Sequence, residues 1–232
     1  AYELVQNSGI PCVNMDLIAG LPEDSREGFR WLARLASLGF GGILADEMGL
    51  GKSVQLIALL LSRYQRNAGE MGDGSLGPSL IVCPASLVYN WGAEFTKFAP
   101  SFNAVVVAGT KAERRTAIGR AFRADEPTVL ITSYDLLRRD VDDYTANEQR
   151  FNVMALDEAQ YIKNHTTKIA KAVKAVAADH RFALTGTPIE NRLSELWSIF
   201  DFLMPGLLGS YKRFHERYEL PISNARAADG ST

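Results

Sequence analysis

The stretch Asp46-Glu47-Met48-Gly49-Leu50-Gly51-Lys52-Ser53 decides the fold of this chain. It lies between a short apolar run, residues 42–45, and a segment in which Leu56, Leu59 and Leu60 recur at helical spacing. A glycine-rich turn that ends in Lys-Ser between a strand and a helix has the pattern of a phosphate-binding loop. The alternative is a glycine-rich turn that contains Lys-Ser by chance, and it leaves the flanking strand and helix unexplained.

The residue types in this loop suit the binding of a nucleoside triphosphate. Gly49 and Gly51 let the backbone turn its N–H groups toward the phosphates, and the N-terminus of the following helix adds partial positive charge. Lys52 would then reach the β- and γ-phosphates, and the hydroxyl of Ser53 would bind Mg²⁺. Asp46 stands where the generic pattern has glycine.

An acidic pair follows another predicted strand. Asp157-Glu158-Ala159-Gln160 comes directly after the apolar run 153–156, and α/β sheets bind ligands at the carboxyl ends of their parallel strands. In that setting Asp157 would hold the Mg²⁺ through water, and Glu158 would be the base or water-orienting group for attack on the γ-phosphate. Taken alone, the two acids are equally typical of a solvated helix start, which the helix dipole stabilises.

A third polar motif, Leu184-Thr185-Gly186-Thr187-Pro188, follows the apolar run 181–184. Taken alone, it is typical of a Thr/Gly/Pro turn that caps the next helix. If it lies at the same edge of the sheet as the acids, its hydroxyls could connect the acidic pair to a partner that moves.

Short, unbroken apolar runs alternate with helical patterns along the chain. Continuous apolar strands indicate a sheet covered on both faces, and strands that alternate with helices indicate a parallel sheet. We therefore predict one α/β domain with a mostly parallel sheet and helices on both faces. The expected strands are residues 42–45, 80–83, 104–107, 129–132, 153–156 and 181–184. The expected helices include residues 26–38, 87–98, 111–122, 135–139, 168–178, 193–203 and 211–218, and residues 66–79 are expected to form a surface loop.

The composition excludes several classes of protein. The 232 residues are 47% hydrophobic, and 25 Lys and Arg against 27 Asp and Glu leave a net charge of −2, which argues against a histone-like nucleic-acid binder. The two cysteines, Cys12 and Cys83, form no CxxC or Cys/His cluster, so a zinc site and a secreted disulfide scaffold are not expected. No apolar run approaches the roughly 18 residues of a membrane span.

Cationic residues recur along two of the predicted helices. We expect them on solvated helix faces rather than in a DNA-facing strip. They are Lys111, Arg114, Arg115, Lys168, Lys171 and Lys174.

The three motifs, in this order, resemble motifs I, II and III of the superfamily 2 helicase-like ATPases. The residues within the motifs resemble those of the Swi/Snf-type branch in particular. In that branch the phosphate loop begins with Asp, as it does here at Asp46. The resemblance covers residues 28–221. Further matches are Cys83-Pro84-Ala85-Ser86-Leu87 with Trp91 and Glu94, Thr132-Ser133-Tyr134, Ile162-Lys163-Asn164 and Glu195-Leu196-Trp197.

The resemblance implies a RecA-like P-loop fold. It divides the chain into a lead-in, residues 1–25, a first RecA-like lobe, residues 26–221, and a polar tail, residues 222–232. Proteins of this branch have two such lobes with ATP between them, and nothing in this sequence resembles the second. We therefore expect the chain to be a fragment of a longer protein.

The resemblance also implies ATP and Mg²⁺ as cofactors and ATP-driven movement along duplex DNA. The implied partners are double-stranded DNA, the second lobe of the parent chain and a DNA-bound target protein. The implied protein is a monomer that is not attached to a membrane. We expect it at the nucleoid of a bacterium or in the nucleus of a eukaryote.

Roles follow from the matched motifs. The implied catalytic residues are Lys52, Asp157 and Glu158, with Ser53 and Asp157 at the Mg²⁺. The implied nucleotide-binding residues are Ser25, Asp46, Met48, Gly49, Leu50, Gly51, Lys52 and Ser53. The implied DNA-binding residues are Pro84, Ser86, Thr132, Ser133, Tyr134 and Lys163, and the implied coupling residues are Gln160, Thr185, Gly186 and Thr187.

Two departures from the family pattern affect these expectations. Ser25 stands where a glutamine usually contacts adenine, so either adenine recognition is weaker here or residues are missing near this position. Arginines from a second lobe are absent, so the isolated lobe is expected to hydrolyse ATP hardly at all. Two alternatives stay open: a strand-separating superfamily 2 helicase acting on RNA or single strands, and a non-catalytic DNA-binding module.

Overall fold

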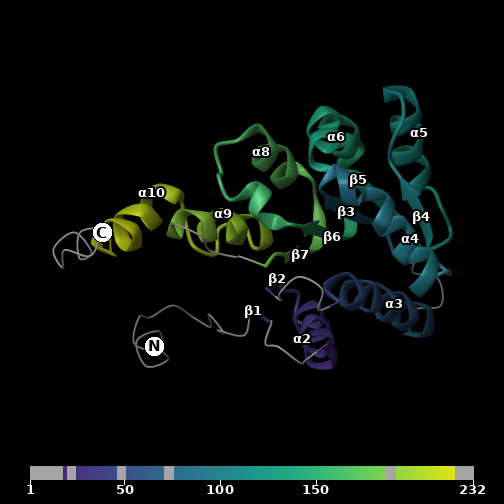
Figure 1. The fold of residues 1–232 in the computed structure, drawn as a ribbon, viewed down its shortest axis with the longest axis horizontal. Coiled ribbons are helices and arrows are strands. Elements are labelled where there is room, and N and C mark those ends of the chain that lie inside the picture. Colours follow the sequence, from purple (N-terminus) through teal and green to yellow (C-terminus); the bar gives the residue numbers. More distant parts are fainter. Residues whose placement is uncertain (1–17, 20–24, 46–50, 71–75, 187–191, 223–232) are drawn as a thin grey trace.

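One parallel sheet organises the part of the chain that the structure describes. The computed structural model describes residues 18–19, 25–45, 51–70, 76–186 and 192–222. Within these ranges seven strands form a single sheet in the order β1-β2-β7-β6-β3-β5-β4, and every pairing is parallel (Figure 1). The strands are β1 (Ile18–Ala19), β2 (Gly42–Leu44), β3 (Ser79–Cys83), β4 (Asn103–Val106), β5 (Thr128–Ser133), β6 (Phe151–Asp157) and β7 (Ala178–Leu184).

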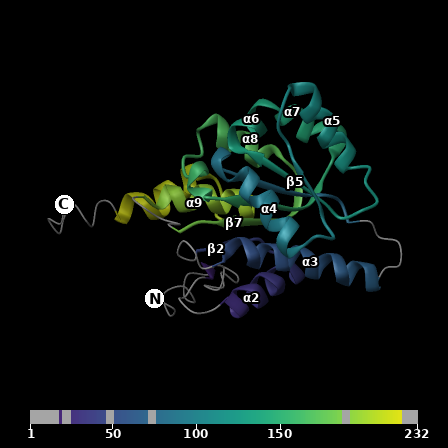
Figure 2. The same cartoon turned by 45° about the vertical axis from the view of Figure 1, so that its right-hand side comes forward.

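Helices cover both faces of this sheet, so the predicted α/β fold is confirmed. Alternate strand residues divide between two apolar clusters: Leu80 and Val82 of β3 belong to one, and Ile81 and Cys83 to the other. Helices α2 (Ser25–Ser37), α3 (Lys52–Glu70) and α4 (Val88–Phe98) bury apolar residues in the second cluster, although Leu35 of α2 packs in the first. Figure 2 shows α5, α6 and α8 on the opposite side of the sheet from α2 and α3.

Three helices of the first cluster begin at polar side chains that cap them. The hydroxyl of Thr110 accepts a hydrogen bond from the Glu113 N–H, and the Glu113 carboxylate accepts one from the Thr110 N–H, which forms a capping box. Ser133 and Thr167 cap the next two long elements in the same way. The three capped helices are α5 (Lys111–Ala121), α6 (Tyr134–Arg139) and α8 (Lys168–Ala175). Helix α9 (Leu193–Leu203) packs in the same cluster and begins after Arg192 without a side-chain cap.

Shorter helical turns complete the described chain. No described helix is long and apolar enough to cross a membrane. The turns are η2 (Ala85–Leu87), α7 (Val141–Tyr144), η3 (Ala146–Glu148), η4 (Ala159–Ile162), α10 (Tyr211–Phe214) and η5 (His215–Glu219), of which η5 is a π-helix.

The sequence-based boundaries were wrong at two places. Residues 66–70 were expected in a loop, but α3 continues through Glu70, because this stretch contains no proline and helices tolerate a single glycine. The helix expected over residues 168–178 ends at Ala175, and β7 begins at Ala178. Pairing with β6, in which Ala178 lies opposite Phe151 and His180 opposite Val153, extends the strand into polar sequence.

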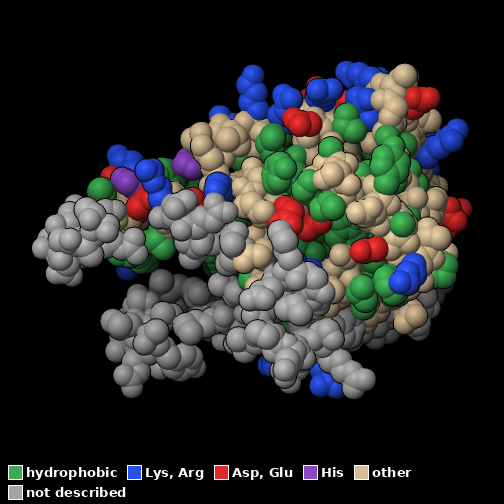
Figure 3. Space-filling model, in the orientation of Figure 1, with side chains coloured by type: hydrophobic (Ala, Val, Ile, Leu, Met, Phe, Trp, Pro, Cys, Tyr) green, Lys and Arg blue, Asp and Glu red, His purple; other side chains and the backbone are tan. Residues whose placement is uncertain are grey.

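Two of the cationic residues expected on solvated faces are instead tied into the fold. Arg114 is 8% exposed, and its guanidinium binds both oxygens of Asp140. Nζ of Lys174 lies 2.8 Å from Oδ2 of Asp201 and 5.2 Å from the ring centroid of Trp197. The other four, Lys111, Arg115, Lys168 and Lys171, are exposed as expected. Figure 3 shows Lys and Arg side chains gathered along the upper edge of the molecule, where Figure 1 places α5 and α6.

Candidate functional site

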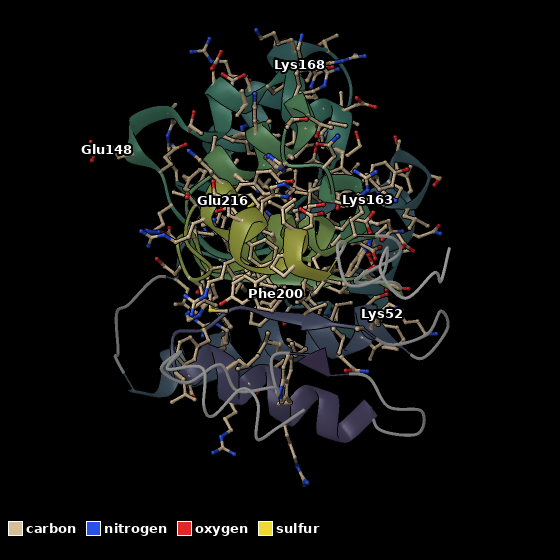
Figure 4. The ribbon with its side chains drawn as sticks, turned by 90° about the vertical axis from the view of Figure 1, so that its left-hand side faces the viewer. Lys52, Glu148, Lys163, Lys168, Phe200 and Glu216 are labelled. Carbon is tan, nitrogen blue, oxygen red and sulfur yellow. The ribbon has the colours of Figure 1, made fainter. Side chains whose placement is uncertain are left out.

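The described parts of the three sequence motifs lie at one edge of the sheet, because the strands before them end at the same level. Leu184 of β7 lies opposite Leu44 of β2 on one side and Asp157 of β6 on the other. The N–H of Thr185 donates to the carbonyl of Leu44 over 3.1 Å. In Figure 4, Lys52 and Lys163, which follow β2 and β6, lie on the same side of the molecule, and Glu148, which precedes β6, lies on the opposite side.

The end of the phosphate-loop motif begins α3. Gly51 has a φ of +78°, a left-handed conformation that favours glycine, and Lys52 is the first helical residue. The N–H of Gln55 donates to the Gly51 carbonyl over 3.0 Å, which starts the helical ladder. Lys52 and Ser53 are therefore placed at the N-terminus of a long helix, where the helix dipole favours anions.

The described residues include only some of the predicted nucleotide-binding residues. Ser25 is the first residue of α2, and nothing is described of its side chain. Thr187, a predicted coupling residue, lies outside the described residues. So do four of the predicted nucleotide-binding residues: Asp46, Met48, Gly49 and Leu50.

Asp157 is the last residue of β6, and two hydrogen bonds fix its carboxylate. The indole N–H of Trp91 donates to Oδ2 over 2.9 Å, and the backbone N–H of Glu158 donates to Oδ1 over 3.0 Å. Burial raises the pKa of Asp157, the neighbouring Glu158 adds to the increase, and the Trp91 bond and the charge of Lys52 oppose it. The carboxylate is thus held in one orientation, within the electrostatic reach of Lys52.

Glu158 adopts a backbone conformation that is uncommon for a residue with a side chain. Its φ is +52° and its ψ is +56°, in the left-handed region. The hydroxyl of Tyr134 donates to the Asp157 carbonyl over 2.8 Å and lies 3.5 Å from the Glu158 carbonyl. Burial raises the pKa of Tyr134 well above its ordinary value, so this hydroxyl stays protonated and able to donate.

A chain of side-chain hydrogen bonds connects β7 to the acidic pair. The hydroxyl of Thr185 donates to Oε1 of Gln160 over 2.9 Å, and Nε2 of Gln160 donates to Oε2 of Glu158 over 2.7 Å. Thr185 is fully buried, and Gly186 is exposed. The structure therefore joins Gln160 and Thr185, two of the residues predicted to couple the acids to a moving partner.

The residues predicted to contact DNA divide into two groups. Ser86 is exposed, and Pro84 and Lys163 are half-buried. Thr132 and Tyr134 are 0% and 2% exposed, and the hydroxyl of Ser133 caps α6 by accepting from the Leu136 N–H. Side-chain contact with a DNA phosphate is therefore not open to Thr132 or Tyr134 in this structure, and DNA contact by this segment stays a prediction.

The arrangement suits Mg²⁺ held together with phosphates better than a metal held by protein alone. Among the described residues, no group of three or more His, Cys, Asp or Glu side chains could hold a metal ion. Mg²⁺ in nucleotide sites usually takes one or two protein ligands and fills the remaining positions with phosphate oxygens and water. Asp157 beside the helix N-terminus that carries Lys52 and Ser53 is compatible with that pattern.

Two contacts of this site were missed by sequence reasoning. Trp91 was matched to a family motif, but its bond to Asp157 links residues 66 positions apart. Tyr161 was not singled out, yet its ring stacks on Tyr134 with centroids 4.7 Å apart and an interplanar angle of 2°. Only the packing of α4 and α6 against the end of β6 brings these side chains together.

Comparison with known families identifies the chain. The family model of the SNF2-related domain matches residues 25–231. The chain belongs to the SNF2-related family. The sequence resemblance to Swi/Snf-type ATPases is thereby confirmed.

Relatives of this SNF2-related chain come from yeast, bacteria and archaea. It is 43% identical over 219 residues to the TATA-binding protein-associated factor MOT1 of Saccharomyces cerevisiae, covering 92% of this chain and 12% of that protein. It is 46% identical over 202 residues to an uncharacterized ATP-dependent helicase of Mycoplasma pneumoniae, covering 87% of this chain and 18% of that protein. The chain thus spans less than a fifth of either curated relative.

A solved structure supports the fold assignment. The Sulfolobus solfataricus SWI2/SNF2 ATPase core in complex with dsDNA superposes with a TM-score of 0.74 and 41% sequence identity. The match covers 89% of this SNF2-related chain and 40% of that one. The Sulfolobus solfataricus SWI2/SNF2 ATPase core domain also matches, with a TM-score of 0.67 over 86% of this chain.

Proposed function

We propose that this SNF2-related domain is the ATP-binding lobe of a duplex-DNA translocase that hydrolyses ATP to ADP and phosphate. The observation that carries the proposal is the meeting of Lys52, Asp157 and Glu158 at the carboxyl edge of the sheet, with Glu158 bonded through Gln160 to Thr185. The kinship with the ATPase core in complex with dsDNA supports duplex DNA as the substrate track. Residues 26–221 form this lobe in the proposal, and the second lobe belongs to the parent protein.

The site residues divide the tasks of ATP hydrolysis among them in this proposal. Lys52 binds the β- and γ-phosphates. Ser53 and Asp157 would hold Mg²⁺, which would neutralise charge on the phosphate oxygens. Glu158 orients a water molecule whose oxygen attacks the γ-phosphorus, and its carboxylate takes the proton. The bond between the γ-phosphorus and the β,γ-bridging oxygen breaks, and ADP leaves. The left-handed turn at Glu158 and the bond from Gln160 fix where this carboxylate points.

The remaining roles concern partners outside this chain. Ser86, Lys163 and the neighbouring Pro84 are the accessible positions for phosphate contacts with DNA, which set position without reading sequence. Thr185 and Gln160 carry a change at the nucleotide to the second lobe. Arginines of that lobe complete the charge stabilisation, so the isolated domain binds nucleotide and turns it over slowly.

The decisive experiment is steady-state ATP hydrolysis by the intact parent protein. The rate is measured with no nucleic acid, with duplex DNA, with single-stranded DNA and with RNA, and Lys52→Ala serves as the blank. Strong stimulation by duplex DNA alone is the expected result. Equal stimulation by RNA and duplex DNA would favour a strand-separating helicase, and no turnover with any of them would favour a non-catalytic DNA-binding module.

Two substitutions separate binding from chemistry. Lys52→Ala should abolish ATP binding, because it removes the cation that contacts the phosphates. Glu158→Gln should keep ATP bound but reduce turnover by about 10²–10⁴-fold, since the amide cannot accept the proton. Binding is measured with a fluorescent ATP analogue and turnover by phosphate release. If Glu158→Gln turns over at the wild-type rate, the base is another residue.

A further inference from the structure

Two stacked tyrosines connect the surface of the molecule to the backbone at Glu158. Tyr134, the first residue of α6, is 2% exposed, and its hydroxyl donates to the Asp157 carbonyl over 2.8 Å. Tyr161, in η4, lies parallel to it and is 49% exposed. One ring is therefore bonded to the acidic pair, and the other presents its outer face to solvent.

The two tyrosines converge on one backbone atom, the carbonyl oxygen of Glu158. The N–H of Tyr161 donates to this oxygen over 3.1 Å, and the Tyr134 hydroxyl lies 3.5 Å from it. A left-handed conformation at a residue other than glycine persists only where its surroundings hold it. The bonds from Tyr134 and Tyr161 are those surroundings, together with the bond from Gln160 to the Glu158 side chain.

The turn that carries Tyr161 is held at its other end as well. The hydroxyl of Ser198, on α9, donates to the Ile162 carbonyl over 2.6 Å. With Ile162 fixed to α9 and Gln160 fixed to Thr185, a displacement of Tyr161 cannot be absorbed by a shift of the whole turn. It acts instead on the Tyr134 ring and on the Glu158 carbonyl.

We propose that Tyr134 is a positioning residue for Glu158, and that Tyr161 transmits contact with duplex DNA to that residue. The second part rests on the proposed function, because it takes duplex DNA as the activating ligand. An exposed phenol two residues before Lys163 offers a hydroxyl to a backbone phosphate, and the parallel stack passes the resulting displacement to Tyr134. DNA thereby sets the orientation of the Glu158 carboxylate and raises the rate of the chemical step, not the affinity for ATP.

The test compares variants of the intact parent protein in steady-state ATP hydrolysis. Tyr134→Phe removes only the hydroxyl and should lower kcat by about tenfold with and without DNA, because small misplacements of a catalytic group are costly. The KM for ATP should stay within about twofold, since the phosphate loop is untouched. A wild-type kcat in Tyr134→Phe would overturn the positioning role.

The surface half of the proposal has its own variants. Tyr161→Ala, which removes the stack, should lower the ratio of the kcat at saturating duplex DNA to the kcat without DNA by about fivefold. Tyr161→Phe, which keeps the stack but removes the hydroxyl offered to the phosphate, should also lose DNA stimulation, and a wild-type kcat at saturating DNA in this variant would overturn transmission through the hydroxyl. A Tyr161→Ala protein that needs more DNA for half-stimulation but reaches the wild-type kcat would mean that Tyr161 only binds DNA.

Tyr218→Ala is the matched control, because it removes another tyrosine that packs on a buried ring, here Phe214 with the ring centroids 5.3 Å apart. This pair lies in α10 and η5, away from β6, so the control should leave kcat unchanged. An equal loss in Tyr218→Ala would attribute the effect of Tyr161→Ala to general destabilisation and would overturn the transmission.

Amide hydrogen exchange tests the positioning role without any turnover. In Tyr134→Phe the Tyr161 N–H, which is bonded to Glu158, should exchange faster than in the wild type, and in Tyr218→Ala it should not. Unchanged exchange would contradict the positioning role. If duplex DNA fails to stimulate the wild type, the proposed function and the Tyr161 half fail together, while exchange and the basal rate still decide the role of Tyr134.

Discussion

The surroundings of Asp157 disfavour the ionised form of its carboxyl group. Its carboxylate accepts one bond from Trp91 and one from the Glu158 N–H, yet burial and the charge of Glu158 raise its pKa. The folded state therefore binds a proton at Asp157 more tightly than the unfolded chain does. Such a group lowers stability at neutral pH, which is a common property of sites that must receive a cation.

Asp157→Asn makes this conflict measurable. The variant carries a neutral amide at every pH, so its melting temperature minus that of the wild type should fall as the pH is lowered from 7 toward 3.8, the ordinary pKa of an aspartate. The sign follows because the wild type gains stability as Asp157 takes up its proton. Thermal unfolding without nucleotide or Mg²⁺ measures the difference, and a difference that grows on acidification would contradict the assignment. Turnover should be lost in the variant at all pH values.

At the scale of the element, one buried ion pair ties α5 to the turn between α6 and α7. The Nε and Nη2 atoms of Arg114 bind the two oxygens of Asp140, which is 2% exposed, and Nη1 donates to the Gly109 carbonyl. The sequence predicted α5 but placed Arg114 on its solvated face. Because α5 has no clear apolar stripe, and Asp140 is 26 residues away, the inward face could not be recognised from the sequence.

Breaking this buried ion pair should destabilise the domain more than breaking an exposed one. Asp140→Ala should lower the free energy of unfolding by about 3 kcal/mol, since it leaves a buried guanidinium without its partner. The control is Asp143→Ala, which breaks a 3.4 Å pair with Arg115, whose side chain is 77% exposed. The control should lose less than about 1 kcal/mol. Chemical denaturation of both variants measures the two values, and similar losses would show that burial is not the cause.

The sequence predicted those elements whose pattern is local. Six strands were found because buried parallel strands are unbroken apolar runs, and the three polar motifs follow three of them. The two-residue strand β1, the four-residue helix α7 and the amino end of β7 at Ala178 depend on packing and pairing instead. For the same reason the motifs of the site were predictable, whereas the bonds from Trp91 and Tyr134 to the Asp157–Glu158 turn were not.

At the scale of the whole molecule, two partly buried histidines make the stability depend on pH. Burial and the nearby Arg63 lower the pKa of His180, on β7, from 6.5 to about 4. Burial and the cations Lys174 and Lys171 also lower the pKa of His165, which lies against Trp197 and Tyr211. Both histidines are neutral in the folded state at a pH where the unfolded chain binds protons.

The stabilising contribution of His180 should therefore be lost as the pH falls from 6.5 toward 4, opposite in sign to the contribution of Asp157. The unfolded state takes up the proton that folded His180 rejects, so the contribution is complete above pH 6.5 and is lost through this window. His180→Gln should show a smaller loss over the same range. Thermal unfolding between pH 8 and pH 4 measures both slopes, and the pH 8 values isolate the packing effect of the substitution. Parallel slopes would exclude His180 as the source.

The hydrogen bond between Trp91 and Asp157 should make the fluorescence of Trp91 sensitive to the state of this carboxylate. Trp91 is one of three tryptophans, is 2% exposed, and points its N–H at the carboxylate. Indole emission responds to charge and hydrogen bonding at the ring nitrogen, so a cation or a proton arriving at Asp157 shifts the wavelength of this fluorophore. Filling and emptying of the site can then be followed in real time without a label, and Trp91→Phe identifies the signal by silencing it.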